Sequence, residues 1–121
     1  MNKPVLGLLL GGVLGVFDGL SALVSAPETA PDILGIVIGS TIKGIVAGAI
    51  IGYIATRVRS AQTVILAGLA VGAFFAFLIA AIPQPDGTHY WWQIMLPGSV
   101  LGLIVGYATQ RYGRGSAPAT R

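Results

Sequence analysis

Two charged residues, Asp18 and Lys43, interrupt stretches of the chain that are otherwise almost entirely apolar. A carboxylate in such a stretch is suited to carry a proton or a cation, and an ammonium beside it acts as the counter-charge. At the centre of a membrane-spanning helix each charge costs roughly 2.5–3.5 kcal/mol, so the two charges are expected to pair or to become neutral. These residues are therefore the first candidates for a functional site.

The positions of Asp18 and Lys43 along their helices indicate a similar depth. When the flanking charged residues are taken as the ends of each span, Asp18 lies about 4 Å and Lys43 about 2 Å from the span centre, both toward the same side. The two stretches are also neighbours in sequence, joined by a short segment. We therefore predict a direct ion pair between Asp18 and Lys43.

Polar side chains and a proline accompany the predicted pair. Ser21 and Ser25 follow Asp18 at i+3 and i+7, which places all three on one helix face. Further candidate lining residues come from the second and fourth apolar stretches, namely Ser40, Thr41 and Gln93. Pro97 has no N–H to offer the Gln93 carbonyl, so it predicts a kink in the fourth helix. Together these residues predict a small polar cluster that opens outward.

The predicted pair has two interpretations from different functional classes. In the first, the chain moves a small ion or solute through a site near Asp18 and Lys43, where cations compete for Asp18 or anions for Lys43. In the second, the chain is a non-transporting structural or accessory membrane subunit, and the pair is a packing lock that fixes helix register. The residues favour neither interpretation, nor a cation over an anion.

The elements that position these residues follow from composition and hydropathy. Of 121 residues, 55% are hydrophobic and 9% are charged, which excludes an ordinary soluble domain and a disordered chain. A helical span needs about 20 mostly apolar residues. Four stretches qualify, roughly 4–25, 33–56, 62–82 and 92–109, and the proline-containing segments between them are expected to be turns. We predict one four-helix transmembrane domain over 1–112 and a flexible cytoplasmic tail over 113–121.

The distribution of basic residues predicts the orientation. Lys3, Arg57, Arg59 and Arg111 flank the spans on one side, whereas the two loops on the other side carry acids and no base. Because short cytoplasmic loops retain Lys and Arg, both termini are expected in the cytoplasm, in a bacterial-type inner membrane. The first stretch also resembles a secretory signal with a cleavage site, but Asp18 within it disfavours that alternative.

Glycines recur in a pattern that indicates an internal duplication. Spans two and four match at an offset of 54, and spans one and three match at an offset of 57. The fold class we predict is all-α, a polytopic membrane protein whose four transmembrane helices form two parallel-repeat helical hairpins. Most of the repeated glycines are four residues apart, so they share helix faces that allow close packing, within one subunit or between subunits. They are Gly11, Gly15, Gly19, Gly44, Gly48, Gly52, Gly68, Gly72, Gly98, Gly102 and Gly106.

Motifs of other functional classes are lacking in the sequence. The chain has no cysteine and one histidine, and it contains no phosphate-binding loop or nucleophile motif. We therefore expect no enzyme activity, no cofactor and no metal, and the few bases predict no nucleic-acid partner. The expected partners are the lipid bilayer and either further copies of the chain or a larger membrane complex.

Overall fold

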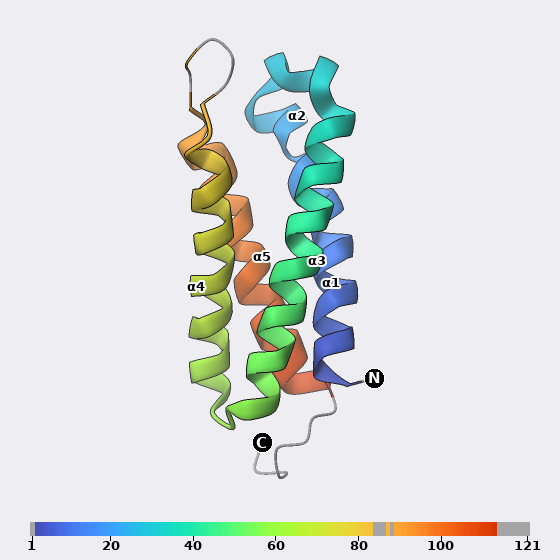
Figure 1. The fold of residues 1–121 in the computed structure, drawn as a ribbon, viewed down its shortest axis with the longest axis vertical. Helices are drawn as coiled ribbons and strands as arrows, with labels where there is room; N and C mark the ends of the chain where they lie inside the picture. Colours follow the sequence, from blue (N-terminus) through green and yellow to red (C-terminus); the bar gives the residue numbers. More distant parts are fainter. Residues whose placement is uncertain (1, 84–86, 88, 114–121) are drawn as a thin grey trace.

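The computed structural model is an elongated helical bundle and describes residues 2–83, 87 and 89–113 (Figure 1). Its elements are α1 (Lys3–Leu20), α2 (Ala22–Ser25), the 3-10 helix η1 (Pro27–Asp32), α3 (Ile33–Arg57), α4 (Ala61–Ala80) and α5 (Trp91–Tyr112). No strand occurs in the described part of the chain, so the all-helical class is confirmed. Residues 114–121 of the predicted tail lie outside the described residues.

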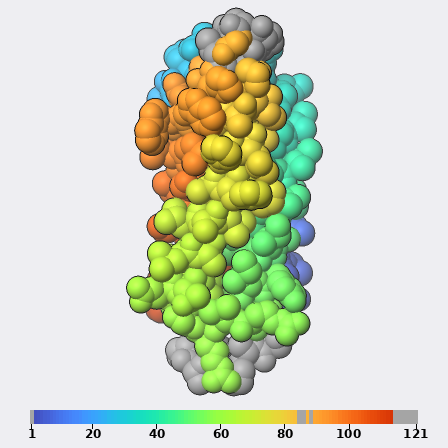
Figure 2. All heavy atoms as spheres, turned by 60° about the vertical axis from the view of Figure 1, so that its left-hand side comes forward, coloured from blue at the N-terminus to red at the C-terminus, as the bar shows by residue number. Residues whose placement is uncertain are grey.

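Four helical segments are long and apolar enough to cross a membrane: Lys3–Ser25, Pro27–Arg57, Ala61–Ala80 and Trp91–Tyr112. The outer surface is rich in large apolar side chains, and Figure 2 shows one such face, with α4 between α3 and α5. On α4, for example, Leu66, Phe74 and Phe77 each expose at least half of their surface. These features are compatible with a multi-pass membrane protein, because a soluble protein rarely exposes so much contiguous apolar surface.

The segment between the first two spans differs from the predicted turn. α1 ends at Leu20, Ser21 forms a turn, and the chain then passes through α2 and η1 before α3 begins at Ile33. The Ser21 hydroxyl donates to the Asp18 carbonyl, a local bond that competes with regular helix geometry. Pro27 stands at the start of η1, where its missing N–H costs nothing. The expectation of a simple turn over 26–32 was therefore wrong.

Helices α1 and α3 pack backbone to backbone through glycine. A Cβ atom at Gly11 would collide with the Gly44 carbonyl, and one at Gly7 would collide with the Gly48 carbonyl. Further toward the end of α1, a Cβ at Gly15 would lie 2.6 Å from the Ser40 carbonyl oxygen. Real Cβ atoms essentially never come so close to another heavy atom, so only glycine permits this helix separation.

The same kind of contact joins α4 to α5. A Cβ at Gly68 would collide with the Gly102 carbonyl, and one at Gly72 would collide with the Gly98 carbonyl. Each of the eleven predicted packing glycines lies against another helix of the same chain. The glycine rows are therefore covered within the subunit.

At the end of the bundle where α3 and α5 finish, Lys3 is buried, with 2% of its surface exposed. Its ammonium donates to the Ala55 carbonyl at 3.0 Å and to Gln110 Oε1 at 3.3 Å. Gln110 Nε2 in turn donates to the Arg59 carbonyl at 2.9 Å. Lys3 thus joins α1 to the ends of α3 and α5. The interpretation of Lys3 as an orientation signal did not predict this contact.

Candidate functional site

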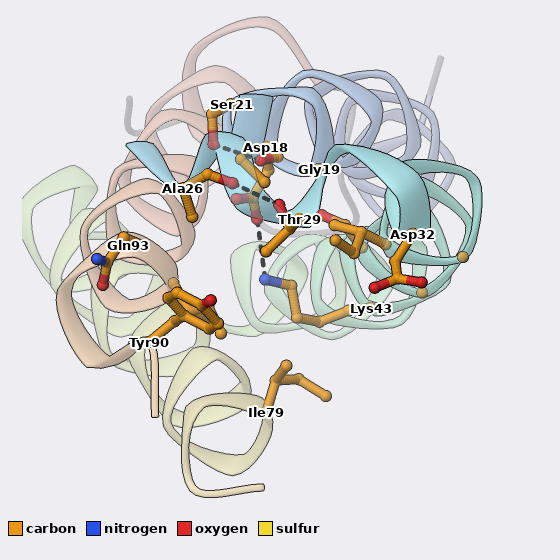
Figure 3. A pocket seen from close by; sticks show the side chains of 16 residues that line it. Asp18, Gly19, Ser21, Ala26, Thr29, Asp32, Lys43, Ile79, Tyr90 and Gln93 are labelled. Carbon is orange, nitrogen blue, oxygen red and sulfur yellow. Dashed lines mark hydrogen bonds and ion pairs between the residues drawn. The ribbon is translucent and has the colours of Figure 1, made fainter. Parts of the chain in front are cut away.

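The Asp18 carboxylate and the Lys43 ammonium form a direct ion pair. Lys43 Nζ lies 2.9 Å from Asp18 Oδ2, and only 10% of the Lys43 side chain and 8% of the Asp18 side chain are exposed. Figure 3 shows the two side chains reaching toward each other, Asp18 from α1 and Lys43 from α3. At this distance and burial the attraction between the charges is far stronger than it would be in water.

Close packing of α1 and α3 explains why the two side chains meet. Gly15 and Gly19 lie on either side of Asp18 in sequence, and a Cβ on either would approach the α3 backbone at Ser40 or Val37 to within 3 Å. Lys43 Nζ lies 3.5 Å from the position of a Cβ at Gly98 on α5. A Cβ at position 98 would therefore be in ordinary contact with the ammonium, whereas it would collide with Ala76 of α4.

The ion pair lines a cavity of about 500 Å³ that is partly open to the outside. The cavity lies where α1, α2 and η1 meet the first turns of α3 and the facing ends of α4 and α5. Besides Asp18 and Lys43 its polar lining consists of Ser21, Thr29, Asp32, Ser40, Tyr90 and Gln93. Its apolar lining includes Ile36, Ile79 and Ile94.

Three of the five predicted lining residues belong to this cavity, and two do not. Ser21, Ser40 and Gln93 line it, whereas Ser25 and Thr41 are not among its lining residues. Ser25 is exposed and donates to the Ser21 carbonyl at 3.2 Å, because the turn at Ser21 takes it off the helical face of Asp18. Thr41 donates to the Val37 carbonyl at 2.6 Å within its own helix. Both predictions as lining residues were wrong.

Pro97 lies inside α5, which continues as a helix on both sides of it. Pro97 is not a lining residue, but the Gln93 side chain one turn earlier is. Because Pro97 has no N–H, the Gln93 carbonyl lacks its usual helical donor.

Sequence reasoning missed Thr29, Asp32 and Tyr90 as lining residues. Thr29 and Asp32 belong to η1, which was expected to be a turn at the surface. Tyr90 precedes α5, and its hydroxyl donates to Glu28 Oε2 at 3.1 Å while its side chain lines the cavity. The clustering of polar residues in the segment 28–32 was the sequence signal that pointed to Thr29 and Asp32, and no such signal pointed to Tyr90.

Two oxygen atoms at the cavity retain unused hydrogen-bonding capacity. Ser40 Oγ is buried and has no hydrogen-bond partner among the described residues. Asp18 Oδ1 accepts no hydrogen bond from the described part of the chain, since the lysine contacts Oδ2 alone. A buried polar atom without a partner costs free energy, so Ser40 Oγ favours a bound polar group or water in the cavity, and Asp18 Oδ1 can accept a hydrogen bond from either.

Comparison with known proteins adds no further assignment. The chain matches no protein-family model, no curated protein and no solved structure. The functional argument therefore depends on the geometry of the cavity and of the ion pair.

Proposed function

We propose that the chain is a multi-pass membrane protein that moves a small ion or solute through the cavity beside Asp18 and Lys43. The observation that carries this proposal is a buried ion pair on the wall of a cavity of about 500 Å³ within an apolar helical bundle. A buried pair adds little net stability compared with apolar side chains of the same size. Ionisable residues that face a cavity between membrane helices are typical of ion and solute pathways.

The proposed topology places the cavity on the outer side of a bacterial-type inner membrane. Arg57 and Arg111 end α3 and α5 at one end of the bundle, while Glu28 and Asp32 lie at the other. Basic residues are retained on the cytoplasmic side, so both termini would be cytoplasmic. In this orientation the cavity receives solutes from the outside.

The proposed transport requires a change of conformation. On the cytoplasmic side of the cavity, Ile51, Leu101 and Val105 form a buried apolar cluster, and Lys3 joins the helix ends below it. A solute at Asp18 must pass this cluster to reach the cytoplasm. Because this buried apolar cluster separates the cavity from the cytoplasmic end of the bundle, we favour a carrier that changes conformation over an open channel.

We also propose that the chain is a duplicated hairpin, with α1 and α3 as one copy and α4 and α5 as the other. Both pairs pack through glycines four residues apart. By sequence, Gly68 and Gly98 correspond to Gly11 and Gly44, which meet in the first copy. In the second copy Gly98 instead meets Gly72, so the contact between its two helices is displaced by one helical turn. Since only the first copy has the charged pair, each chain would hold one site.

The proposed oligomer would use other surfaces than the glycine rows. Those rows are covered within the chain, whereas large apolar side chains such as Leu34, Phe74 and Trp92 are exposed. A second copy, a larger membrane complex or lipid would therefore contact aliphatic and aromatic side chains.

A flux assay in proteoliposomes tests the proposed transport. We expect the protein to speed the entry of protons, sodium chloride, choline chloride or glycerol by about tenfold over protein-free vesicles for at least one of them. Pyranine fluorescence reports the protons, and stopped-flow light scattering reports the osmolytes. The double variant Asp18→Asn/Lys43→Met removes both charges together and is expected to lose this flux, because the carboxylate that receives the solute is gone.

The matched control is Glu28→Gln, which makes the same chemical change at a carboxylate outside the cavity lining and keeps an oxygen that can accept the hydrogen bond from the Tyr90 hydroxyl. Its flux should equal that of the unmodified protein. Transport would be ruled out by vesicles that show no protein-dependent entry of any of the four probes. Equal flux in the unmodified protein and in the charge-free double variant would remove the ion pair from the mechanism.

A further inference from the structure

The charges that line the cavity favour a positively charged ligand. Asp18 and Asp32 contribute two carboxylates and Lys43 contributes one ammonium. The single ion pair within the described residues joins Lys43 to Asp18, so Asp32 forms none there. The remaining described bases lie outside the cavity lining, so ionised side chains give the cavity a net negative charge.

The oxygen atoms available inside the cavity support the same conclusion. Asp18 Oδ1 and Ser40 Oγ have no hydrogen-bond donor among the described residues. Figure 3 shows the Gln93 and Tyr90 side chains across the cavity from Asp18. The Ser40 and Tyr90 hydroxyls and the Gln93 amide can accept as well as donate hydrogen bonds. An ionised carboxylate can only accept them, so Asp18 favours a ligand that donates hydrogen bonds or carries positive charge.

Size and apolar lining distinguish an organic cation from a bare metal ion. The cavity volume of about 500 Å³ is far larger than a coordinated metal ion needs and lies in the range typical of small-molecule sites. Ile36, Ile79 and Ile94 supply an apolar wall, and Tyr90, an aromatic residue of a type that can stabilise a cation, also lines the cavity. A ligand with a cationic head and a small apolar body would use both kinds of surface.

We propose that the cavity binds a small organic cation, an ammonium compound with an apolar body, whose charged group contacts Asp18 in competition with Lys43. The proposal rests on the proposed function, because it names the class of solute that the carrier would move. In this arrangement Lys43 is an internal competitor that occupies Asp18 when the cavity holds no ligand. Displacement leaves the carboxylate paired with the incoming cation, but it removes the counter-charge of the Lys43 ammonium, and this cost weakens ligand binding as long as Lys43 is present.

Calorimetric titration of the detergent-purified full chain tests this proposal with three probes of similar shape. Choline carries a positive charge, 3,3-dimethylbutan-1-ol is its neutral carbon analogue, and 3,3-dimethylbutanoate is negatively charged. We expect choline to bind, and the alcohol and the anion to bind about tenfold more weakly or not at all. Sodium chloride at the same concentration should produce no equivalent heat.

The choline affinity of variants at the charged residues distinguishes a ligand-binding ion pair from a purely structural one. Lys43→Met removes the internal competitor, so we expect it to tighten choline binding by about tenfold, whereas Asp18→Asn should weaken binding by at least that factor. Asp32→Asn changes an exposed residue and is not expected to affect folding, and it should weaken choline binding by roughly threefold. The control Glu28→Gln should bind choline as the unmodified chain does.

The inference would be overturned by preferential binding of the anion or by equal binding of choline and its neutral analogue. It would also be overturned if choline binding were unchanged in both single variants, Asp32→Asn and Asp18→Asn. A sodium response equal to that of choline would also overturn it, since sodium needs no apolar wall. Binding in detergent requires no transport. Choline binding without liposome flux would therefore reject the proposed transport alone, and flux of other probes without choline binding would reject the cation site alone.

Discussion

Asp18→Asn on its own is expected to lower the free energy of unfolding by about 3–5 kcal/mol, because it leaves the Lys43 ammonium buried without a counter-charge. Only 10% of the Lys43 side chain is exposed, so water in the cavity replaces only part of the interaction with the lost carboxylate. Adding Lys43→Met should recover most of this loss, since the double variant buries no uncompensated charge. Unfolding of the detergent-solubilised protein by increasing mole fractions of dodecyl sulfate measures these differences.

The double-mutant cycle gives the strength of the coupling between the two residues. We expect the effects of the single substitutions to be strongly non-additive, with a coupling above about 1 kcal/mol, because the side chains are in direct contact. The control Glu28→Gln should change the free energy of unfolding by less than about 0.5 kcal/mol, as is usual for an exposed residue. Additive effects of Asp18→Asn and Lys43→Met would contradict the ion pair.

Gly44→Ala is expected to destabilise the protein by about 1–3 kcal/mol or more, because its methyl group would overlap the Gly11 carbonyl on α1. The overlap involves backbone atoms, so it is relieved only if the two helices move apart. Separation of α1 from α3 would also lengthen the contact between Asp18 and the adjacent Lys43. The same dodecyl sulfate titration measures the loss of stability.

Gly39→Ala is the matched control, since it lies on the same helix and a Cβ at that position meets nothing within 4 Å. Alanine favours a helix over glycine, so Gly39→Ala should be neutral or stabilise by up to about 1 kcal/mol. A loss of stability in Gly39→Ala equal to that in Gly44→Ala would show that helix propensity, and not the α1–α3 contact, determines the result.

The parts of the site that the sequence could predict depend on regular helix geometry. The rise per residue placed Asp18 and Lys43 at a similar depth, and in the structure their charged atoms are 2.9 Å apart. Four-residue spacing likewise predicted helix faces of small residues, and glycines of α1 and α3 lie in contact. Periodicity is informative wherever a helix is long and uninterrupted.

The parts that the sequence could not predict depend on tertiary contacts or on breaks in that geometry. The turn at Ser21 removed Ser25 from the face of Asp18, and η1 brought Asp32 to the cavity from a segment expected to be an exposed turn. Lys3 is buried only because α1 begins between the ends of α3 and α5. Neither a local propensity nor a hydropathy pattern contains that information.

The most direct test of the central claim is the flux of the charge-swapped variant Asp18→Lys/Lys43→Asp in proteoliposomes. The swap keeps opposite charges on α1 and α3, so the variant should fold, but it reverses the charge at each of the two positions that line the cavity, with the ammonium now at position 18 and the carboxylate at position 43. We predict that the swapped protein is stable and shows no more flux than protein-free vesicles. If the swapped variant recovered both stability and flux, the account would be contradicted. Flux would then depend only on the presence of an ion pair between α1 and α3, and not on which of the two positions holds the carboxylate.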